Sequence, residues 1–263
     1  MTQNYRFVSE EMQRSDWLSV YINSFVSQYD PNTSYLDPES KDRFDVDMSG
    51  NYAGIGARLQ KKIDKVEITE VISGGPAWRD NILVKGDAIL KVRQDDEQEP
   101  VSILTMRLSE AVKLIKGKKG TKVHLTIKKD DGSISEVTVK RDIVQLEETY
   151  IKSSIVEKDN NSYGIINIPK FYIDFDNQNN RDAAKDLRTE IERLKEQGMK
   201  GLVIDLRNNT GGALKTVVDM AGMFIKNGPV VQVKYFDKEK QVLSDRDRAI
   251  LWTGPLVILV NES

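Results

Sequence analysis

A pair of glycines, Gly211-Gly212, joins an apolar strand pattern to a helical one. Backbone amides that glycine frees at the start of a helix can hold a negative oxygen, either of a phosphate or of the oxyanion formed in acyl transfer. No lysine or third glycine follows in the pattern of a nucleotide-binding loop, which disfavours phosphate. A strand-to-helix turn with no catalytic role is the alternative. Asp205 and Arg207, at the end of the strand, are expected to pair and anchor the loop rather than act as acid and base.

A second glycine pair, Gly54-Ile55-Gly56, stands before a predicted strand and is followed by Ala57. In such a turn successive backbone N–H groups can point at one spot and hold a carboxylate. A peptide laid along the adjacent strand edge would then be recognised by its free C-terminus. Taken alone, the triplet favours a simple tight turn. Gly74-Gly75-Pro76-Ala77 and a predicted helix over Ser109–Lys116 follow later in the chain.

The rarest side chains limit the catalytic chemistry. The sequence has no cysteine and one histidine, so thiol catalysis is excluded and a serine–histidine pair would have to use His124. His124 alternates with aliphatic residues, which predicts a solvent-facing strand residue with no catalytic role. Ser263 follows the apolar strand that ends at Val260 and is a candidate nucleophile by position only, because terminal residues are usually frayed.

The composition is that of an ordinary globular protein of one or two domains, with 263 residues and 39% hydrophobic residues. Lys and Arg (39) nearly balance Asp and Glu (41), so no basic field is available for nucleic acid or an anionic membrane. No apolar run reaches the length of about 18 residues that a membrane span needs, and the first residues do not read as a signal peptide. We therefore expect either a cytoplasmic protein or one whose targeting segment is absent from this sequence.

Hydrophobic periodicity divides the chain into three parts. Residues 15–29 predict an amphipathic helix, and the turn-rich residues 30–38 predict a loop. Short strands around one helix follow up to Asp142, and after Ile143 strands and helices alternate as β-α-β-α-β. The predicted strands are Val66–Val71, Ala88–Val92, Val123–Lys128, Ile134–Lys140, Tyr163–Ile168, Gly201–Ile204, Val230–Tyr235 and Pro255–Val260, and the later helices are Ser109–Lys116 (N-cap Ser109), Arg181–Gln197 and Ala213–Lys226. The fold class is therefore α+β and α/β, in a multidomain chain.

Several stretches, in order from about Asp30 to the last residue, carry a family resemblance. They are Asp30-Pro31-Asn32-Thr33-Ser34-Tyr35-Leu36, Gly54-Ile55-Gly56-Ala57, Gly74-Gly75-Pro76-Ala77, Leu114-Ile115-Lys116-Gly117, Ile168-Pro169-Lys170-Phe171-Tyr172, Asp205-Leu206-Arg207-Asn208-Asn209-Thr210-Gly211-Gly212 and Gly254-Pro255-Leu256-Val257. The chain resembles the tail-specific, or C-terminal-processing, serine proteases that carry a PDZ domain.

The resemblance implies an N-terminal helical segment over residues 1–45, a PDZ domain over 46–142, and an incomplete protease domain of the crotonase/ClpP-like β-α-β type over 143–263. It implies that Gly54, Ile55, Gly56 and Ala57 bind the peptide carboxylate. The Ser109–Lys116 helix would then form the other wall of the peptide groove. Gly211 and Gly212 would supply the oxyanion hole.

The same resemblance implies hydrolysis by a Ser/Lys dyad, with the nucleophile at the middle serine of a Ser-Ala-Ser-Ala-Ser-Glu motif. That motif and the lysine base are expected beyond Ser263, so we expect this chain to bind tails without cutting them. No cofactor and no metal site are expected. The expected partners are polypeptides with free, apolar C-terminal tails, and no nucleic acid. The resemblance also allows a membrane-associated lipoprotein or another adaptor, and it implies a periplasmic or cell-envelope location. The sequence does not give the oligomeric state.

Two other functions are compatible with the same residues. One is a non-catalytic PDZ adaptor or pseudoenzyme, in which the β-α part is only a scaffold. The other is an acyl-CoA or nucleotide enzyme built on the Gly211-Gly212 turn. This alternative is disfavoured, because the sequence around the turn contains no phosphate-anchoring motif.

Overall fold

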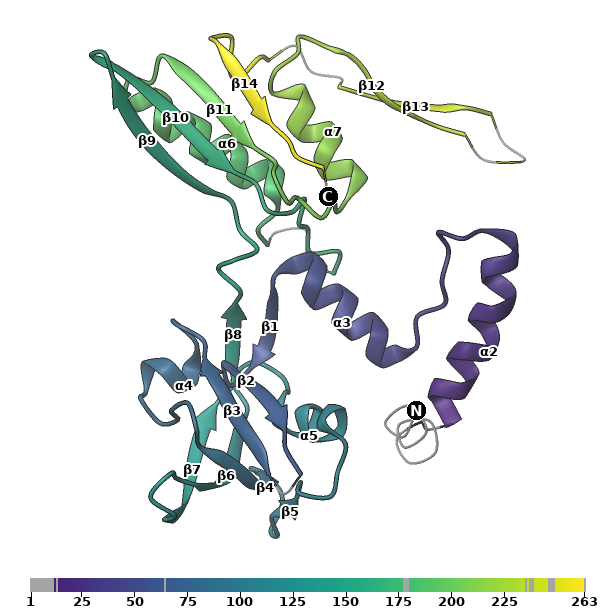
Figure 1. Cartoon of the computed structure of the whole chain (residues 1–263), viewed down its shortest axis with the longest axis vertical. Helices are drawn as coiled ribbons and strands as arrows, with labels where there is room; N and C mark the ends of the chain where they lie inside the picture. Colours follow the sequence, from purple (N-terminus) through teal and green to yellow (C-terminus); the bar gives the residue numbers. More distant parts are fainter. Residues whose placement is uncertain are drawn as a thin grey trace. The chain divides into compact units, whose positions relative to one another are not determined.

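The chain divides into two compact units (Figure 1). The computed structural model describes residue 12 and residues 14–63, 65–176, 180–234, 236, 239–245 and 249–262. The first unit contains the described residues up to Arg43 together with Asn51–Gln145. The second contains Phe44–Gly50 together with the described residues from Leu146 onward.

The first unit is built on a sheet with the strand order β2-β3-β4-β6-β7, with β5 paired to β4 and a separate β1–β8 pair. Its strands are β1 (Asn51–Gly54), β2 (Ala57–Lys61), β3 (Val66–Val71), β4 (Ala88–Gln94), β5 (Val101–Ser102), β6 (Lys122–Lys128), β7 (Ile134–Lys140) and β8 (Asp142–Gln145), and its helices include α4 (Pro76–Arg79) and α5 (Leu108–Ile115). The four strands predicted for this part are confirmed. Among the strands of the described residues, β2 pairs only with β3, so its other edge is unpaired there.

Alternation of side chains explains how this sheet buries its core. In β6, Val123, Leu125 and Ile127 have no exposed surface, and they pack with α5 residues such as Ala111. His124 faces the other side, as predicted, but its side chain is only 15% exposed. The ring is partly covered there, because Asp95 and Thr138 lie within hydrogen-bond distance of its two nitrogens, at 3.0 and 2.8 Å.

Helix α5 begins one residue earlier than predicted. Ser109 is inside α5 and not its N-cap, which is Arg107. The reason is that the Glu110 carboxylate accepts a hydrogen bond from the Arg107 N–H at 3.2 Å and so closes the first turn around Arg107.

Two helices precede the sheet. The predicted helix over residues 15–29 is confirmed as α2 (Arg14–Tyr29), and the predicted loop over 30–38 ends where α3 (Pro38–Ser49) begins. Helix α3 was not predicted. Asp37 caps it, since its carboxylate accepts hydrogen bonds from the backbone N–H groups of Glu39 and Ser40, both at 3.0 Å. These bonds lower the pKa of Asp37.

The second unit contains a sheet with the order β14-β11-β10-β9, in which β10, β11 and β14 are parallel and β9 is antiparallel. Its elements are β9 (Lys152–Lys158), β10 (Asn161–Asn167), α6 (Ala183–Glu196), β11 (Gly201–Asp205), α7 (Leu214–Gly222), β12 (Gly228–Val233), β13 (Gln241–Asp245) and β14 (Leu256–Leu259). Buried α6 residues such as Leu187, Ile191 and Leu194 pack on Ile166 and Leu202 of the sheet. This is the expected β-α-β order, which brings the C-terminal ends of three parallel strands to one edge.

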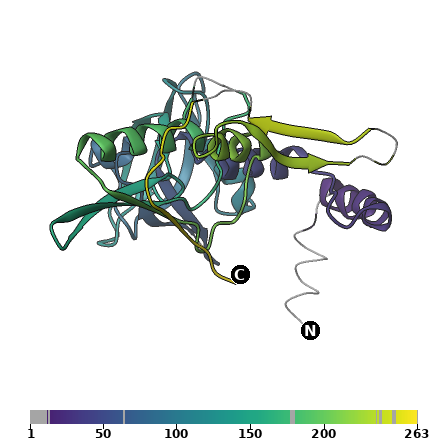
Figure 2. The ribbon, with the colours of Figure 1, turned by 90° about the horizontal axis from the view of Figure 1, so that it is seen from above.

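Three details of the second unit differ from the predictions. The strand predicted at Val230–Tyr235 exists as β12, but it forms a hairpin with β13 outside the main sheet and has no buried residue. Helix α7 ends at Gly222, before the predicted Lys226, because the Met223 carbonyl accepts a hydrogen bond from the Leu251 N–H at 2.8 Å. Strand β11 was expected to be covered on both faces, but Val203 is only half-buried. The β12–β13 hairpin extends away from the sheet in both ribbon views (Figures 1 and 2).

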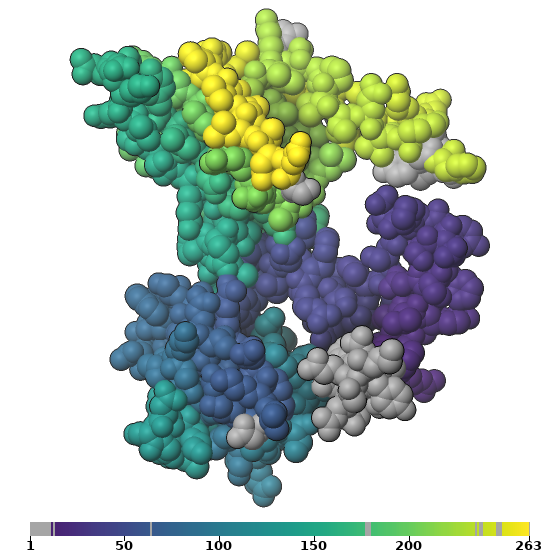
Figure 3. Space-filling view, in the orientation of Figure 1, coloured from purple at the N-terminus to yellow at the C-terminus, as the bar shows by residue number. Residues whose placement is uncertain are grey.

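Strand β14 lies at the surface of the second unit (Figure 3). Val257 and Ile258 are each 53% exposed, and within the described part of the chain β14 pairs with β11 alone. None of the helices in the described ranges has the length and apolar character that crossing a bilayer requires.

Candidate functional site

The turn Gly54-Ile55-Gly56 leads from β1 into the edge strand β2, and all three residues are buried. The Ile55 carbonyl accepts a hydrogen bond from the Ala77 N–H at 2.9 Å, and the Gly56 carbonyl accepts one from the Ile72 N–H at 2.9 Å. In a trans peptide the N–H points opposite to the carbonyl of the same unit. The N–H groups of Gly56 and Ala57 therefore point away from Ala77 and Ile72, respectively.

The turn needs glycine at its centre. Gly56 has a φ of +79°, and a Cβ placed on it would lie 3.0 Å from the Cα of Gly75 and 3.3 Å from the Cδ of Pro76. Among the described residues, the Ile55 and Gly56 N–H groups donate to no backbone acceptor. Buried N–H groups are rarely left without an acceptor, so this turn has the hydrogen-bonding capacity to hold an anion.

Strand β2, with its unpaired edge, and helix α5 follow this turn in the chain and contact each other. Leu59 of β2 and Leu108 of α5 are partly buried apolar residues that pack on the core between these elements. The C-terminal end of α5 is fixed by Arg141, which is 3% exposed. Its guanidinium donates to the carbonyls of Ile115 at 2.8 Å and Leu114 at 3.0 Å. Burial lowers the pKa of this guanidinium.

The second predicted site, the Gly211-Gly212 turn, follows β11 and leads into α7. Gly211 donates its N–H to the Asn209 side-chain oxygen at 2.8 Å, and its carbonyl accepts from the Phe171 N–H at 2.9 Å. By the same trans-peptide geometry, the Gly212 N–H points away from Phe171. Gly212 is exposed, and within the described part of the chain its N–H donates no backbone hydrogen bond. Of the two predicted oxyanion amides, only that of Gly212 is therefore available.

Polar side chains fix the loop before this turn. As predicted, Asp205 and Arg207 pair: the Arg207 Nε and terminal nitrogen reach the two carboxylate oxygens at 2.9 and 2.7 Å. This pairing lowers the pKa of Asp205. Asn208, at a φ of +61°, exchanges two hydrogen bonds with Asn261 beyond β14, at 2.8 and 2.9 Å. Asn261 was not singled out as functional, and its partner 53 residues away cannot be read from local sequence. Ser263 lies outside the described residues.

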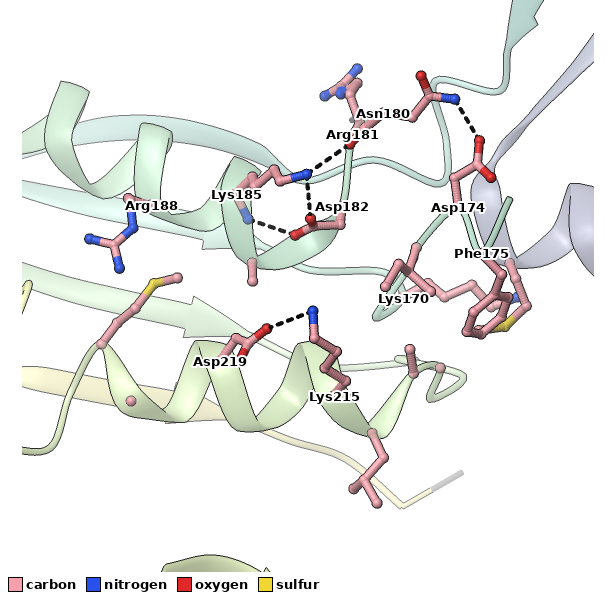
Figure 4. A pocket seen from close by; sticks show the side chains of 18 of the residues that line it. Lys170, Asp174, Phe175, Asn180, Arg181, Asp182, Lys185, Arg188, Lys215 and Asp219 are labelled. Atoms are coloured by element: carbon pink, nitrogen blue, oxygen red, sulfur yellow. Dashed lines mark hydrogen bonds and ion pairs between the residues drawn. The ribbon is translucent and has the colours of Figure 1, made fainter. Parts of the chain in front are cut away.

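A large pocket of about 1350 Å³ opens beside the Gly212 turn, within the second unit. Figure 4 shows charged side chains of α6, among them Lys185 and Arg188, on one side of it and Lys215 and Asp219 of α7 on the other. Lys170, which the sequence motif contained but to which no role was given, also lines the pocket and pairs with the Asp47 carboxylate. The described residues contain no group of three His, Cys, Asp or Glu side chains that could hold a metal ion.

Two family models match the chain. Residues 44–128 match the PDZ domain, and residues 162–263 match peptidase family S41. The chain is 33% identical over 265 residues to a tail-specific protease of Haemophilus influenzae, which covers 99% of this chain and 37% of that protein. It is 34% identical over 236 residues to the carboxy-terminal processing protease CtpA of Bacillus subtilis, which covers 89% of this chain and 46% of that protein.

A solved structure also resembles part of the chain. It is the PDZ domain of a carboxy-terminal protease from Vibrio cholerae in complex with peptide, with 39% identity, a TM-score of 0.35, and coverage of 36% of this chain and 99% of that one.

These matches define the class of protein, which is a PDZ domain joined to a serine peptidase domain of family S41. Within that class, the curated relatives of this chain are named tail-specific protease and carboxy-terminal processing protease. The chain spans less than half the length of both curated relatives.

Proposed function

We propose that the first unit captures the free C-terminus of an unstructured polypeptide, as the recognition step of a C-terminal-processing protease. The observation that carries this proposal is the geometry of the Gly54-Ile55-Gly56 turn. Its Ile55 and Gly56 carbonyls accept hydrogen bonds from Ala77 and Ile72, and the N–H groups of the same two peptide units point the opposite way. A terminal carboxylate is the anion that backbone N–H groups at the end of an open strand edge are suited to receive.

The bound tail would extend along β2 as an added antiparallel strand, with α5 as the opposite wall. Main-chain hydrogen bonds to the unpaired β2 edge would give affinity without sequence preference. Apolar contacts with Leu59 and Leu108 would favour tails that end in apolar residues. We retain residues 46–142 as the extent of this PDZ domain and residues 143–263 as the protease part.

For the whole protein we propose peptide hydrolysis by a Ser/Lys dyad, with the Gly212 N–H as one donor to the oxyanion. This assignment is supported by the exposed Gly212 amide and by the family S41 match over residues 162–263. The printed sequence contains no Ser-Ala-Ser-Ala-Ser-Glu motif. We therefore propose that residues 1–263 bind tails and hydrolyse none, and we retain a cell-envelope location as an expectation.

Titration of the purified chain with a fluorescent peptide tests the binding step. The peptide ends in small apolar residues, with a free C-terminus in one sample and an amidated one in the other. We expect tighter binding of the free acid, and loss of that preference in Gly56→Trp. The matched control is Gly120→Trp, because Gly120 also has a positive φ (+87°) but has open space around it. Equal binding of the acid and the amide by the unmodified chain would refute the proposal.

A separate assay tests the absence of hydrolysis. The chain is incubated with the same peptides, and the products are analysed by mass spectrometry. No cleavage is expected. Cleavage that disappears in Ser263→Ala would show that Ser263 is the nucleophile and that the family alignment at the end of this chain is wrong.

A further inference from the structure

Lys116 follows α5 directly and lies beside the carboxylate-binding turn. A Cβ placed on Gly54 would lie 3.7 Å from the Cγ of Lys116 and 2.8 Å from the ring of Tyr52. The Lys116 ammonium stands over that same ring, 4.9 Å from its centroid. Tyr52, Gly54 and the Lys116 side chain are thus neighbours at the turn where the terminal carboxylate is expected.

The charge of Lys116 distinguishes it from the other lysines near it. Lys113 pairs with Glu39 at 3.3 Å, and Lys119 pairs with Asp142 at 3.0 Å. Lys116 is half-buried, and none of the carboxylates in the described ranges lies within ion-pair distance of its ammonium. Burial lowers the pKa of Lys116, and the more distant charge of Asp42 partly opposes that effect. A half-buried cation without an anion at contact distance gains more from an incoming carboxylate than a solvated, paired one does.

The position of Lys116 is fixed by buried hydrogen bonds. Its N–H donates to the Val112 carbonyl at 2.8 Å, and Arg141 holds the two preceding carbonyls. Gln94 adds a hydrogen bond to the Leu114 carbonyl at 2.9 Å. A Cβ on Gly117 would lie 2.9 Å from the Arg141 guanidinium, so the chain passes close to this arginine directly after Lys116. The lysine therefore leaves a rigid point of the backbone, which reduces the cost of ordering it on a ligand.

We propose that Lys116 is a specificity-determining residue that supplies the counter-charge for the terminal carboxylate of the bound tail, with Tyr52 holding its side chain over the Gly54 turn. This inference rests on the proposed function of the turn. The backbone N–H groups hydrogen-bond the carboxylate, and Lys116 favours its negative charge over a neutral amide.

Peptide titrations on three variants test this assignment. In Lys116→Met the side-chain stem that packs on Tyr52 is kept and the charge is lost. We expect about tenfold weaker binding of the free acid, the size of one partly buried charge interaction, and an unchanged affinity for the amidated peptide. Lys116→Arg should restore most of the affinity for the acid. Lys113→Met, on the same helix, is the matched control and should bind like the unmodified chain.

Salt dependence gives a second readout that a merely structural role would not change. The affinity of the unmodified chain for the acid should fall with added NaCl more steeply than that of Lys116→Met, and thermal unfolding should confirm that both are folded. If the unmodified chain prefers the acid and Lys116→Met keeps that preference, the Lys116 assignment is wrong and the proposed function stands. If the unmodified chain shows no preference for the acid, both are wrong.

Discussion

Replacement of Gly212 by alanine tests the geometry of the candidate oxyanion turn. Gly212 has a φ of +147°, and a Cβ placed on it would lie 2.7 Å from the carbonyl carbon of Phe171 and 2.9 Å from its Cα, with the oxygen closer still. The strand-like bridge between Phe171 and Gly212 cannot accept that atom without moving. Gly211 is the matched control, because it has a φ of +87° but no atom within 4 Å of its Cβ position.

The magnitudes follow from these contacts. Gly211→Ala should lose about 1–2 kcal/mol of unfolding free energy, the cost of a left-handed alanine. Gly212→Ala carries a similar strain and also separates Phe171 from the turn. That separation breaks two hydrogen bonds, from the Phe171 N–H to Gly211 and from the Ala213 N–H to Phe171, both at 2.9 Å. At about 1 kcal/mol each, these bring the expected loss to about 3–4 kcal/mol.

Urea unfolding followed by tryptophan fluorescence measures this difference. Trp252 packs against the core of the second unit, whereas Trp17 and Trp78 belong to the first. In a background with Trp17→Phe and Trp78→Phe, the signal therefore reports the second unit. An extra loss of about 2 kcal/mol for Gly212→Ala lowers the urea midpoint by about 1 M relative to Gly211→Ala. Equal midpoints for the two variants would refute the close approach of Phe171 and the turn.

Three further outcomes follow from the contacts of both units. Arg141→Met should destabilise the first unit by about 3 kcal/mol in urea unfolding, because it removes the five hydrogen bonds of a buried guanidinium, including the one to the buried Ile115 carbonyl; an unchanged midpoint would contradict this. Asn261→Ala should lower the thermal midpoint of the second unit, because it removes both hydrogen bonds to Asn208, and Asn261→Gln should not restore it. The hydrogen bond from the Arg79 guanidinium is the largest contribution that lowers the pKa of Asp142 below its ordinary value near 3.8. This contribution is present above that value and is lost as the pH falls below it, so Arg79→Gln should flatten the acid limb of a stability–pH profile, and an unchanged limb would speak against the pair.

Local patterns were sufficient for the elements with regular periodicity. Strand β6 alternates fully buried residues with polar ones, and α6 carries Leu187, Ile191 and Leu194 on one face, so both were predicted to within two residues of their ends. Helix α3 was missed because its apolar residues are few and only Met48 and Ser49 are buried. The signal that could have found it was Asp37-Pro38, a capping residue followed by proline at the first helical position.

The candidate sites were predictable as motifs but not as geometries. Both glycine turns lie where strand and helix patterns meet, so their positions follow from the sequence. Which amide of each turn is free depends on distant partners. Asn209 occupies the Gly211 N–H, and Ala77 turns the Gly56 N–H outward. Lys116 could not be recognised from its sequence neighbours, because its environment is created by Tyr52, more than 60 residues earlier.

The most direct test of the account is a ¹⁵N-edited NMR titration of the chain with a peptide that ends in a free, apolar C-terminus. We predict that the amide resonances of Ile55, Gly56 and Ala57 show the largest shifts, downfield, as they donate hydrogen bonds to the carboxylate. The amidated peptide should leave these resonances near their free positions. Largest shifts elsewhere in the chain, or the same shifts with the amidated peptide, would contradict the claim that this turn binds the C-terminus of a tail.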